Sequence, residues 1–407
     1  MLLREKITSR YPIKKKHIVN ILRLYVSFLI VCYYNNIYQF PLLPFLYFFV
    51  PLQVFNFSHR GKLIKKIVLT INLLKMDSQK IRAAITGVEA YIPSYILTND
   101  ELSDMVDTTD EWIMTRVGIR ERHLLKEPGE GMSYMAERAV KQLLEKTNTD
   151  PSEIGALICS TVTPDMVFPA AASIIADKCG IVNAMTFDMN VGCAGFIHAF
   201  KTISLYIESG FCKKAIVVSG EKMSAIIDYT DRNTCPLFGD GAAAVLVEPR
   251  QDGTGLQDAI LRSDGAGRQY LKMVGGGSQM PASLESVKQR LHYVYQDGKN
   301  VFKWAVSKMA DVSCEIMERN GLKPEDVAYL LPHQANMRII DAVANRMGIN
   351  KEDKVLVNIE NFGNTSSATI PILMWDKKDM FKKGDNLILS SFGAGFAWGS
   401  LWIKWAI

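Results

Sequence analysis

The sequence lacks the cysteine pattern of a disulfide framework and the Cys/His clusters of a zinc site. Its 407 residues include seven cysteines and six histidines, and no two cysteines have the Cys-x-x-Cys spacing. An odd number of scattered cysteines does not fit a secreted, disulfide-stapled domain, and the absence of paired ligands excludes a structural zinc domain. We therefore expect a reducing, cytoplasmic environment, no metal, and a thiol that is free to act as a nucleophile.

Acidic residues are almost missing from the first 75 positions, which hold 12 Lys or Arg and one acid, Glu5. From Met76 onward 35 basic residues face 41 acidic ones, so this larger part has a net charge of −6 although the whole chain has +5. Because the basic excess is confined to one end, the rest lacks the charge of a nucleic-acid-binding surface. We expect no nucleic-acid partner.

Residues 1–75 contain two apolar runs, 18–34 and 37–57, and admit three interpretations. A membrane anchor is one, but the first run is barely long enough and prolines break the second. A secretory signal is another, but no small-residue cleavage site follows the first run. We favour the third, that translation starts at Met76, because a complete first strand follows at 81–88. On that interpretation no membrane attachment is expected.

The rest of the chain has the pattern of an α/β protein. With 48% hydrophobic residues it can form one large core or two medium ones. Short apolar runs typical of strands alternate with helical patterns, which predicts layers of helices and sheets. The predicted strands are 156–159, 215–219, 243–247, 329–331 and 386–390.

The second half of this region resembles the first. The segment DPSEIGALICS from Asp150 matches KPEDVAYLLPH from Lys323 at an offset of 173 residues. The strand AIVVS at 215–219 matches NLILS at 386–390 at an offset of 171, and FGDGAAAVLV resembles FGAGFAWGSL. Chance similarity between strand–helix units is the alternative explanation. We favour two similar α/β halves.

The same offset of 171 places Gly192-Cys193 on Gly363-Asn364, so two chemically distinctive residues occupy equivalent loop-to-helix junctions. A site between the halves follows naturally. We therefore divide the chain into an extension, 1–75, and two halves, 76–250 and 251–407.

Cys193 stands between the strand-like segment 185–189 and an amphipathic helix. At the start of a helix, free N–H groups and the helix dipole favour a thiolate, and Gly192 lets a substrate approach. Alternatively, the cysteine could be a small packing residue. The apolar positions of the predicted helix are Phe196, Ala199, Phe200, Ile203 and Ile207.

His333 and Asn364 are the other candidates. His333 follows an apolar strand and Pro332, which places the imidazole at the carboxyl edge of a sheet, where α/β sites lie. A structural role for this histidine remains open. Asn364 precedes an apolar helix that it could simply cap, but beside a Cys and a His its amide could donate to an oxyanion. The glycine-rich SFGAGFAWG offers backbone N–H groups for the same purpose.

These segments together resemble β-ketoacyl-acyl carrier protein synthase III, the initiating condensing enzyme of bacterial fatty acid synthesis. The resemblance covers about four fifths of the chain, from about Met76. The motifs that carry it are DTTDEWIMTRVGIRERH from Asp107, the Cys193 segment, FGDGAAAVLVEP, LPHQANMRI, GNTSSATIP and FGAGFAWGS.

The resemblance implies a thiolase-like fold, with two duplicated halves in an α-β-α-β-α layering, and a homodimer. It implies that Cys193 is the acylated nucleophile and that His333 and Asn364 promote decarboxylation of a malonyl unit. The backbone N–H groups of Cys193 and Ala394 would stabilise the oxyanion of acyl transfer. The substrates would be a short acyl-coenzyme A and malonyl-acyl carrier protein, with no cofactor.

The resemblance also implies binding residues. Trp112, Arg116 and Arg232 would hold the adenine end of coenzyme A by stacking and charge. Phe168 would reach across the dimer into the partner's acyl pocket. The acyl carrier protein would contact Gln334, Ala335, Asn336, Met337 and Arg338, together with Lys303 and Arg346.

Two departures limit the transfer. Residues 190–192 read Asn-Val-Gly where the family more often has small alanines, which leaves the preference for straight or branched primers open, and the extension has no family counterpart. Two alternatives remain. One is a related condensing enzyme for a specialised polyketide or quinolone starter, which product analysis would distinguish. The other is a membrane-tethered, non-catalytic acyl-binding protein, which would release no carbon dioxide.

Overall fold

The computed structural model describes residues 80–407. The expectations for residues 1–75, including the alternative start at Met76 and the two apolar runs, lie outside the described residues. Within 80–407, no helix combines the length and the apolar character needed to cross a membrane.

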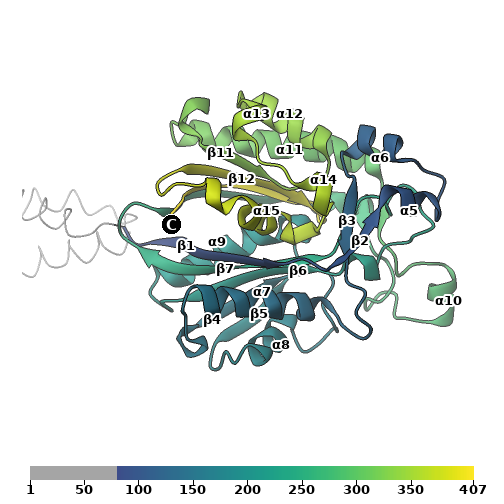
Figure 1. The fold of residues 1–407 in the computed structure, drawn as a ribbon, viewed down its shortest axis with the longest axis horizontal. Helices are drawn as coiled ribbons and strands as arrows, with labels where there is room; N and C mark the ends of the chain where they lie inside the picture. Colours follow the sequence, from purple (N-terminus) through teal and green to yellow (C-terminus); the bar gives the residue numbers. More distant parts are fainter. Residues whose placement is uncertain (1–79) are drawn as a thin grey trace, which may run out of the picture. The chain divides into compact units, whose positions relative to one another are not determined.

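The first sheet is five-stranded, in the order β1-β7-β6-β4-β5 (Figure 1). Strand β4 pairs in parallel with β5 on one side and with β6 on the other, while β7 is antiparallel to both β6 and β1. Its strands are β1 (Arg82–Tyr91), β4 (Ala156–Ser160), β5 (Met185–Met189), β6 (Ala215–Glu221) and β7 (Gly241–Arg250).

The second sheet repeats this arrangement in the order β8-β13-β12-β11. Strand β11 is parallel to β12, and β13 is antiparallel to β12 and β8. Val355 forms a parallel bridge with Leu330 of β11, and so takes the position next to β11 that β5 takes next to β4 in the first sheet. The duplication predicted from the sequence is therefore confirmed in the strand order. The strands are β8 (Gly255–Ser263), β11 (Tyr329–Pro332), β12 (Asn386–Gly393) and β13 (Ala397–Lys404).

Helices separate and cover the two sheets (Figure 1). Two lie between the sheets, α9 (Gly195–Glu208) and α15 (Thr369–Lys377), and their apolar side chains join both sheets in one buried cluster. The outer face of the first sheet packs on α7 (Met132–Lys146) and α8 (Ala171–Lys178). That of the second packs on α11 (Gly298–Arg319) and α12 (Met337–Met347). The α-β-α-β-α layering of a thiolase-like fold is confirmed.

Shorter helices and two-stranded ribbons complete the fold. They are α5 (Asn99–Ser103), α6 (Asp110–Val117), α10 (Leu284–Lys288), α13 (Lys351–Lys354) and α14 (Ile359–Phe362), with the ribbons β2 (Tyr95–Thr98) and β3 (Glu121–Leu124), and β9 (Leu271–Lys272) and β10 (Tyr295–Gln296). Two single-turn 3-10 helices, η3 (Gly192–Ala194) and η7 (Ser366–Ala368), precede the two central helices.

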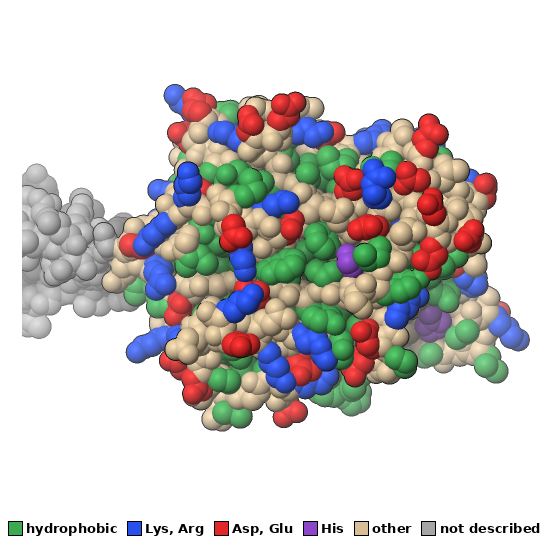
Figure 2. All heavy atoms as spheres, in the orientation of Figure 1, with side chains coloured by type: hydrophobic (Ala, Val, Ile, Leu, Met, Phe, Trp, Pro, Cys, Tyr) green, Lys and Arg blue, Asp and Glu red, His purple; other side chains and the backbone are tan. Residues whose placement is uncertain are grey.

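Local sequence explains why the helices near the candidate residues begin and end where they do. The side chain of Asn336 accepts a hydrogen bond from the Arg338 N–H at the start of α12, and Gly348 ends this helix with φ 68°. In the same way Thr109 caps α6, and Gly118 ends it with φ 79°. Figure 2 shows acidic and basic side chains interspersed over most of the face drawn.

Candidate active site

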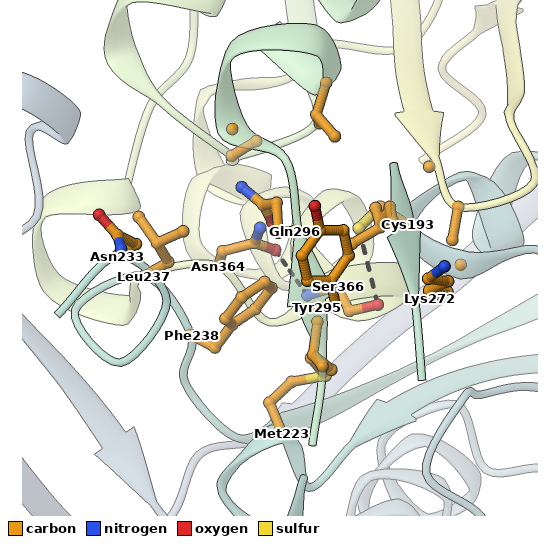
Figure 3. A pocket seen from close by; sticks show the side chains of 18 of the residues that line it. Cys193, Met223, Asn233, Leu237, Phe238, Lys272, Tyr295, Gln296, Asn364 and Ser366 are labelled. Atoms are coloured by element: carbon orange, nitrogen blue, oxygen red, sulfur yellow. Dashed lines mark hydrogen bonds between the residues drawn. The ribbon is translucent and has the colours of Figure 1, made fainter. Parts of the chain in front are cut away.

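Cys193, His333 and Asn364 line one cavity of about 1370 Å³, as the sequence predicted. The cavity lies where the carboxyl ends of strands from both sheets meet, since Cys193 follows β5 and His333 follows β11. Figure 3 shows Cys193, Ser366 and Asn364 side by side, joined by dashed hydrogen bonds. Residues 80–407 contain no group of three or more His, Cys, Asp or Glu side chains that could hold a metal ion.

The nucleophile candidate sits in η3, where two backbone turns approach without a side chain between them. A Cβ on Gly393 would lie 2.5 Å from the Cys193 nitrogen, and a Cβ on Gly192 would lie 2.7 Å from the Ala394 nitrogen. Gly192 also has φ 52°, a conformation that favours glycine. The sequence predicted that Gly192 gives room to a substrate. The structure adds a second reason for glycine here: Gly192 lines the cavity, and it also gives room to the turn after β12.

This approach brings the backbone of Cys193 close to that of Ala394, and both residues line the cavity. The carbonyl of Cys193 accepts a hydrogen bond of 2.8 Å from the Ser391 hydroxyl, so β12 fixes the peptide unit of the nucleophile. Two neighbouring N–H donors are the arrangement that an oxyanion needs.

The surroundings of Cys193 disfavour a thiolate. Burial raises the pKa of the Cys193 thiol to about 12, although a hydrogen bond with Ser366 acts in the opposite direction. The sulfur donates to the Ser366 hydroxyl at 3.7 Å. Burial thus opposes the thiolate that the helix start was expected to favour, although part of the Cys193 side chain still reaches solvent.

His333 is buried, with 2% of its surface exposed, and its backbone N–H donates to the Ser390 carbonyl at 2.8 Å. Its Nδ1 lies 2.7 Å from the hydroxyl of Thr369, the first residue of α15. Burial lowers the pKa of the imidazole to about 3, so the ring is neutral. A neutral ring carries one proton, which is on Nε2 if the Thr369 hydroxyl donates to Nδ1 and on Nδ1 if that hydroxyl donates to the Ser366 carbonyl, 3.2 Å away.

Asn364 is held by a bridge between the halves. Its N–H donates to the Leu237 carbonyl at 2.9 Å, and its carbonyl accepts from the Gly239 N–H at 3.1 Å. The side-chain oxygen accepts from the Ser366 N–H at 2.8 Å. Since that oxygen is engaged, the NH₂ group is the part of the amide left to serve as a donor in the cavity.

Three residues predicted to bind coenzyme A lie together at the edge of the cavity. Trp112 and Arg116, both in α6, line it, and the guanidinium carbons of Arg116 and Arg232 each lie 4.7 Å from the centre of the Trp112 ring. Arg232 also pairs with the carboxylate of Asp107 at 3.1 Å. The arrangement combines an aromatic face with two cations.

The segment after His333 divides into a buried part and an exposed part. Gln334 is 1% exposed, because its amide donates to Pro332 and accepts from the N–H groups of Asn358 and Ile359. It therefore has no surface for a carrier protein, and that expectation is corrected: Gln334 fastens the loop before α14.

The remaining residues of the segment approach the surface. Ala335, Asn336 and Met337 are partly buried, whereas Arg338 is exposed with its guanidinium carbon 5.0 Å from the centre of the Phe302 ring. Ala335, Asn336 and Arg338 line the cavity. Asn336 donates to the Arg116 carbonyl at 3.2 Å and so joins α12 to α6.

The other predicted contact residues lie away from the cavity wall. Lys303 is exposed on α11, and Arg346 is exposed but paired with Asp311 at 3.0 Å. Phe168, between β4 and α8, is 83% exposed. None of these three lines the cavity within the described chain.

Comparison with known proteins places this geometry in a family. The family model of 3-oxoacyl-[acyl-carrier-protein (ACP)] synthase III matches residues 187–265. The model of the C-terminal part of this enzyme matches residues 317–405. A β-ketoacyl-[acyl-carrier-protein] synthase III of Bacteroides thetaiotaomicron is 54% identical over 327 residues, which are 80% of this chain and 97% of that one. This chain belongs to the β-ketoacyl-[acyl-carrier-protein] synthase III family.

Solved structures similar to this chain agree with the family assignment. The synthase III of Aquifex aeolicus matches with a TM-score of 0.73 and 37% identity, covering 79% of this chain and 100% of that one. The priming β-ketosynthase of the R1128 polyketide pathway matches with a TM-score of 0.73 and 33% identity, covering 80% and 96%. The synthase III fold is thus shared with a polyketide enzyme.

Sequence reasoning missed the hydroxyl groups of this synthase III site. Ser366 contacts the Cys193 sulfur, and Thr369 contacts the His333 ring. Both lie in the segment GNTSSATIP, where hydroxyls three positions apart before an apolar helix were a usable signal. Nothing in the sequence marked Ser391, which lies inside an apolar strand.

We expect Gly393→Ala to destabilise the protein by about 1–3 kcal/mol, because backbone atoms on both sides cannot move away from the added methyl group. Gly265→Ala is the control, since its Cβ would meet nothing within 4 Å. The measurement is the free energy of urea unfolding. Equal stability of the two variants would contradict the close approach of the turns.

The neutrality of His333 predicts a pH dependence of stability. Because its pKa falls from 6.5 in the unfolded chain to about 3 in the fold, the unfolded chain binds a proton first. The free energy of unfolding should therefore fall as pH is lowered from 6.5 towards 3. His333→Asn should show a smaller decrease over this interval, whereas His198, also of lowered pKa, contributes to both proteins. Identical slopes would contradict a neutral His333.

Proposed function

We propose that this enzyme condenses a short acyl-coenzyme A with malonyl-acyl carrier protein and thereby initiates fatty acid synthesis. The products are 3-oxoacyl-acyl carrier protein, coenzyme A and carbon dioxide. The observation that carries the proposal is the meeting of Cys193, His333 and Asn364 in one cavity with Trp112 at its edge. No cofactor is needed, because every step uses groups of the chain or the substrates.

The first step is acyl transfer to Cys193. The sulfur attacks the thioester carbonyl, the carbon–sulfur bond of acyl-coenzyme A breaks, and the thiol proton leaves with coenzyme A. The N–H groups of Cys193 and Ala394 stabilise the oxyanion. Trp112, Arg116 and Arg232 hold the adenine and phosphate end by stacking and charge.

The second step uses the malonyl unit. Its carboxylate leaves as carbon dioxide, and the bonding electrons form an enolate on the thioester. His333 and the Asn364 NH₂ group donate to the enolate oxygen. For this the His333 proton must be on Nε2, which requires the Thr369 hydroxyl to donate to Nδ1 at 2.7 Å and not to the Ser366 carbonyl at 3.2 Å. The enolate carbon then attacks the acyl-Cys193 thioester and releases the Cys193 sulfur, which takes up a proton.

The carrier protein docks beside the cavity mouth, at Arg338 and the adjoining Ala335, Asn336 and Met337. Arg338 lines the cavity and has no carboxylate within ion-pair distance among the described residues. Lys303 extends the same basic region on α11. Arg346 is a weaker candidate for contact with the carrier protein, because its charge is already paired with Asp311. An acidic carrier needs such a local patch, because the chain from Met76 is net negative.

We infer a homodimer in the cytoplasm, built from chains whose halves are 76–250 and 251–407. Its support is strand β5, which lies at the edge of the first sheet with all five residues only partly buried. Beside it the loop after β4 exposes Val167 and Phe168 by 89% and 83%. Exposed apolar side chains beside an open sheet edge favour pairing with a second copy, whose acyl pocket Phe168 would enter.

A specialised polyketide starter enzyme is the second candidate, favoured by the 33% identity to the R1128 priming synthase. The two share the condensation and differ in the carrier protein and the primer. The two candidates can be distinguished by measuring the rate of condensation with a fatty acid carrier protein and with a polyketide carrier protein, each with straight and with branched acyl primers. The carrier protein that is used faster indicates the pathway.

We expect Cys193→Ala to abolish acyl-enzyme formation and to leave decarboxylation of malonyl-acyl carrier protein. His333→Ala and Asn364→Ala should do the reverse, and should slow decarboxylation by roughly 100- to 1000-fold, as loss of an oxyanion donor does. Mass spectrometry of the acyl-enzyme and release of carbon dioxide measure the two steps. A stable acyl-enzyme in Cys193→Ala would refute the nucleophile.

We expect Arg338→Glu to raise the KM for malonyl-acyl carrier protein by roughly tenfold at low salt, with a smaller effect at high salt. Acylation by acyl-coenzyme A should change little. Lys213→Glu, at an exposed position between α9 and β6, is the matched control. Equal damage by Arg338→Glu to both steps would place this residue in the coenzyme A path or the framework.

A further inference from the structure

Glu221, the last residue of β6, is a buried carboxyl group behind Cys193 that the proposed mechanism does not use. None of its surface is exposed, and its charge would raise the pKa of the Cys193 thiol. Among the described residues no Lys, Arg or His lies within ion-pair distance of it. The ammonium group of the next residue, Lys222, points away and donates to the Glu130 carbonyl at 2.6 Å.

One oxygen of Glu221 accepts three hydrogen bonds from the loop after β4. The donors to Oε2 are the Thr161 hydroxyl at 3.1 Å, the Val162 N–H at 3.0 Å and the Thr163 hydroxyl at 2.8 Å. Both hydroxyl oxygens also accept a backbone N–H, so their own protons are free to point at Glu221. This oxygen is fully satisfied.

The other oxygen faces Ser367 in η7. The number of protons available at this contact bears on whether Glu221 is ionised or neutral. Oε1 of Glu221 and Oγ of Ser367 are 2.8 Å apart, and the same Oγ lies 3.0 Å from the Ser160 carbonyl. The serine has one proton for these two acceptors if Glu221 is ionised. If Oε1 carries a proton, Glu221 donates to Ser367 and Ser367 donates to Ser160, and every group is paired.

We propose that Glu221 is a neutral carboxylic acid that donates to Ser367 and so positions the turn of Asn364 and Ser366 against Cys193. Burial without a counter-ion favours this state: desolvation raises the pKa of Glu221, although the donors on Oε2 and a hydrogen bond from the Ser367 hydroxyl to Oε1 would act in the opposite direction. The titratable groups facing it are the thiols of Cys193 and Cys159, both harder to ionise when Glu221 is charged.

Neutrality at this position matters for the proposed condensation, on which the catalytic part of the inference rests. Negative charge develops on oxygens beside Cys193 and Asn364, and a carboxylate behind them would oppose it. A protonated acid gives the same hydrogen bonds without that charge. Glu221 is thus a positioning residue that acts through Ser367.

Glu221→Gln tests the protonation state without any substrate. Its amide oxygen can accept the three donors while its NH₂ group donates to Ser367, as the neutral acid does. We expect the rate of Cys193 alkylation by iodoacetamide to follow pH in the same way in both proteins. Faster alkylation of the variant at neutral pH would show that a negative charge had been removed, and would overturn the proposal. Because this comparison needs no condensation, it stands or falls separately from the proposed function.

The positioning role is tested by kinetics of the wild-type enzyme and its variants. Glu221→Gln should keep kcat within about twofold, whereas Glu221→Ala and Ser367→Ala should lower kcat for malonyl decarboxylation about tenfold and leave the KM for acyl-coenzyme A unchanged. Ser204→Ala, which removes a buried hydroxyl in α9 that donates to the Lys201 carbonyl, is the matched control. If Glu221→Ala does not fold, Ser367→Ala carries the test. Full activity of Ser367→Ala, or loss of activity in Glu221→Gln, would overturn the role.

Discussion

The close approach of two backbone turns, one from each half, is the constraint on which the site depends. Gly192 and Gly393 leave no space for a side chain between the peptide of Cys193 and the turn after β12. The hydrogen bond from Ser391 to the Cys193 carbonyl closes the same contact from the other side. The position of the nucleophile is therefore set by the second half of the chain, and neither half contains a complete site.

The buried site is built from neutral groups. Burial raises the pKa of the Cys193 thiol and lowers the pKa of the His333 imidazole, which favours a neutral thiol and a neutral ring over a thiolate–imidazolium pair before a substrate enters. In the proposed mechanism the donors to the oxygens that become negative are the N–H groups of Cys193 and Ala394 and the Asn364 amide. Groups that stabilise charge only as it develops lower the barrier, whereas a fixed ion pair would bind the ground state as well.

The sequence predicted the layers and the duplication, because strand periodicity and distinctive motifs are local properties. It also singled out Cys193, His333 and Asn364, which line one cavity and whose catalytic roles stay predictions. It did not predict the ionisation of Cys193, since a helix start is visible in the sequence and desolvation is not. Nor did it show that Gln334 points inward, because its partners Asn358 and Ile359 are more than 20 residues away. Glu221 was visible as an acid ending an apolar strand, but its contact with Ser367 required the fold.

The duplication explains how one fold brings together two different chemical groups, a nucleophile at Cys193 and a hydrogen-bond donor at Asn364. Cys193 precedes α9 and Asn364 precedes α15, at equivalent turns of the two halves, and both helices lie between the sheets. Equivalent turns in stacked halves face the same cavity, so a nucleophile and an oxyanion donor are brought together by the repeat itself. Ser366 then joins them, because its hydroxyl contacts the Cys193 sulfur while its N–H holds the Asn364 oxygen. Divergence of a few residues at these turns, within an unchanged framework, is sufficient to give each half its own role.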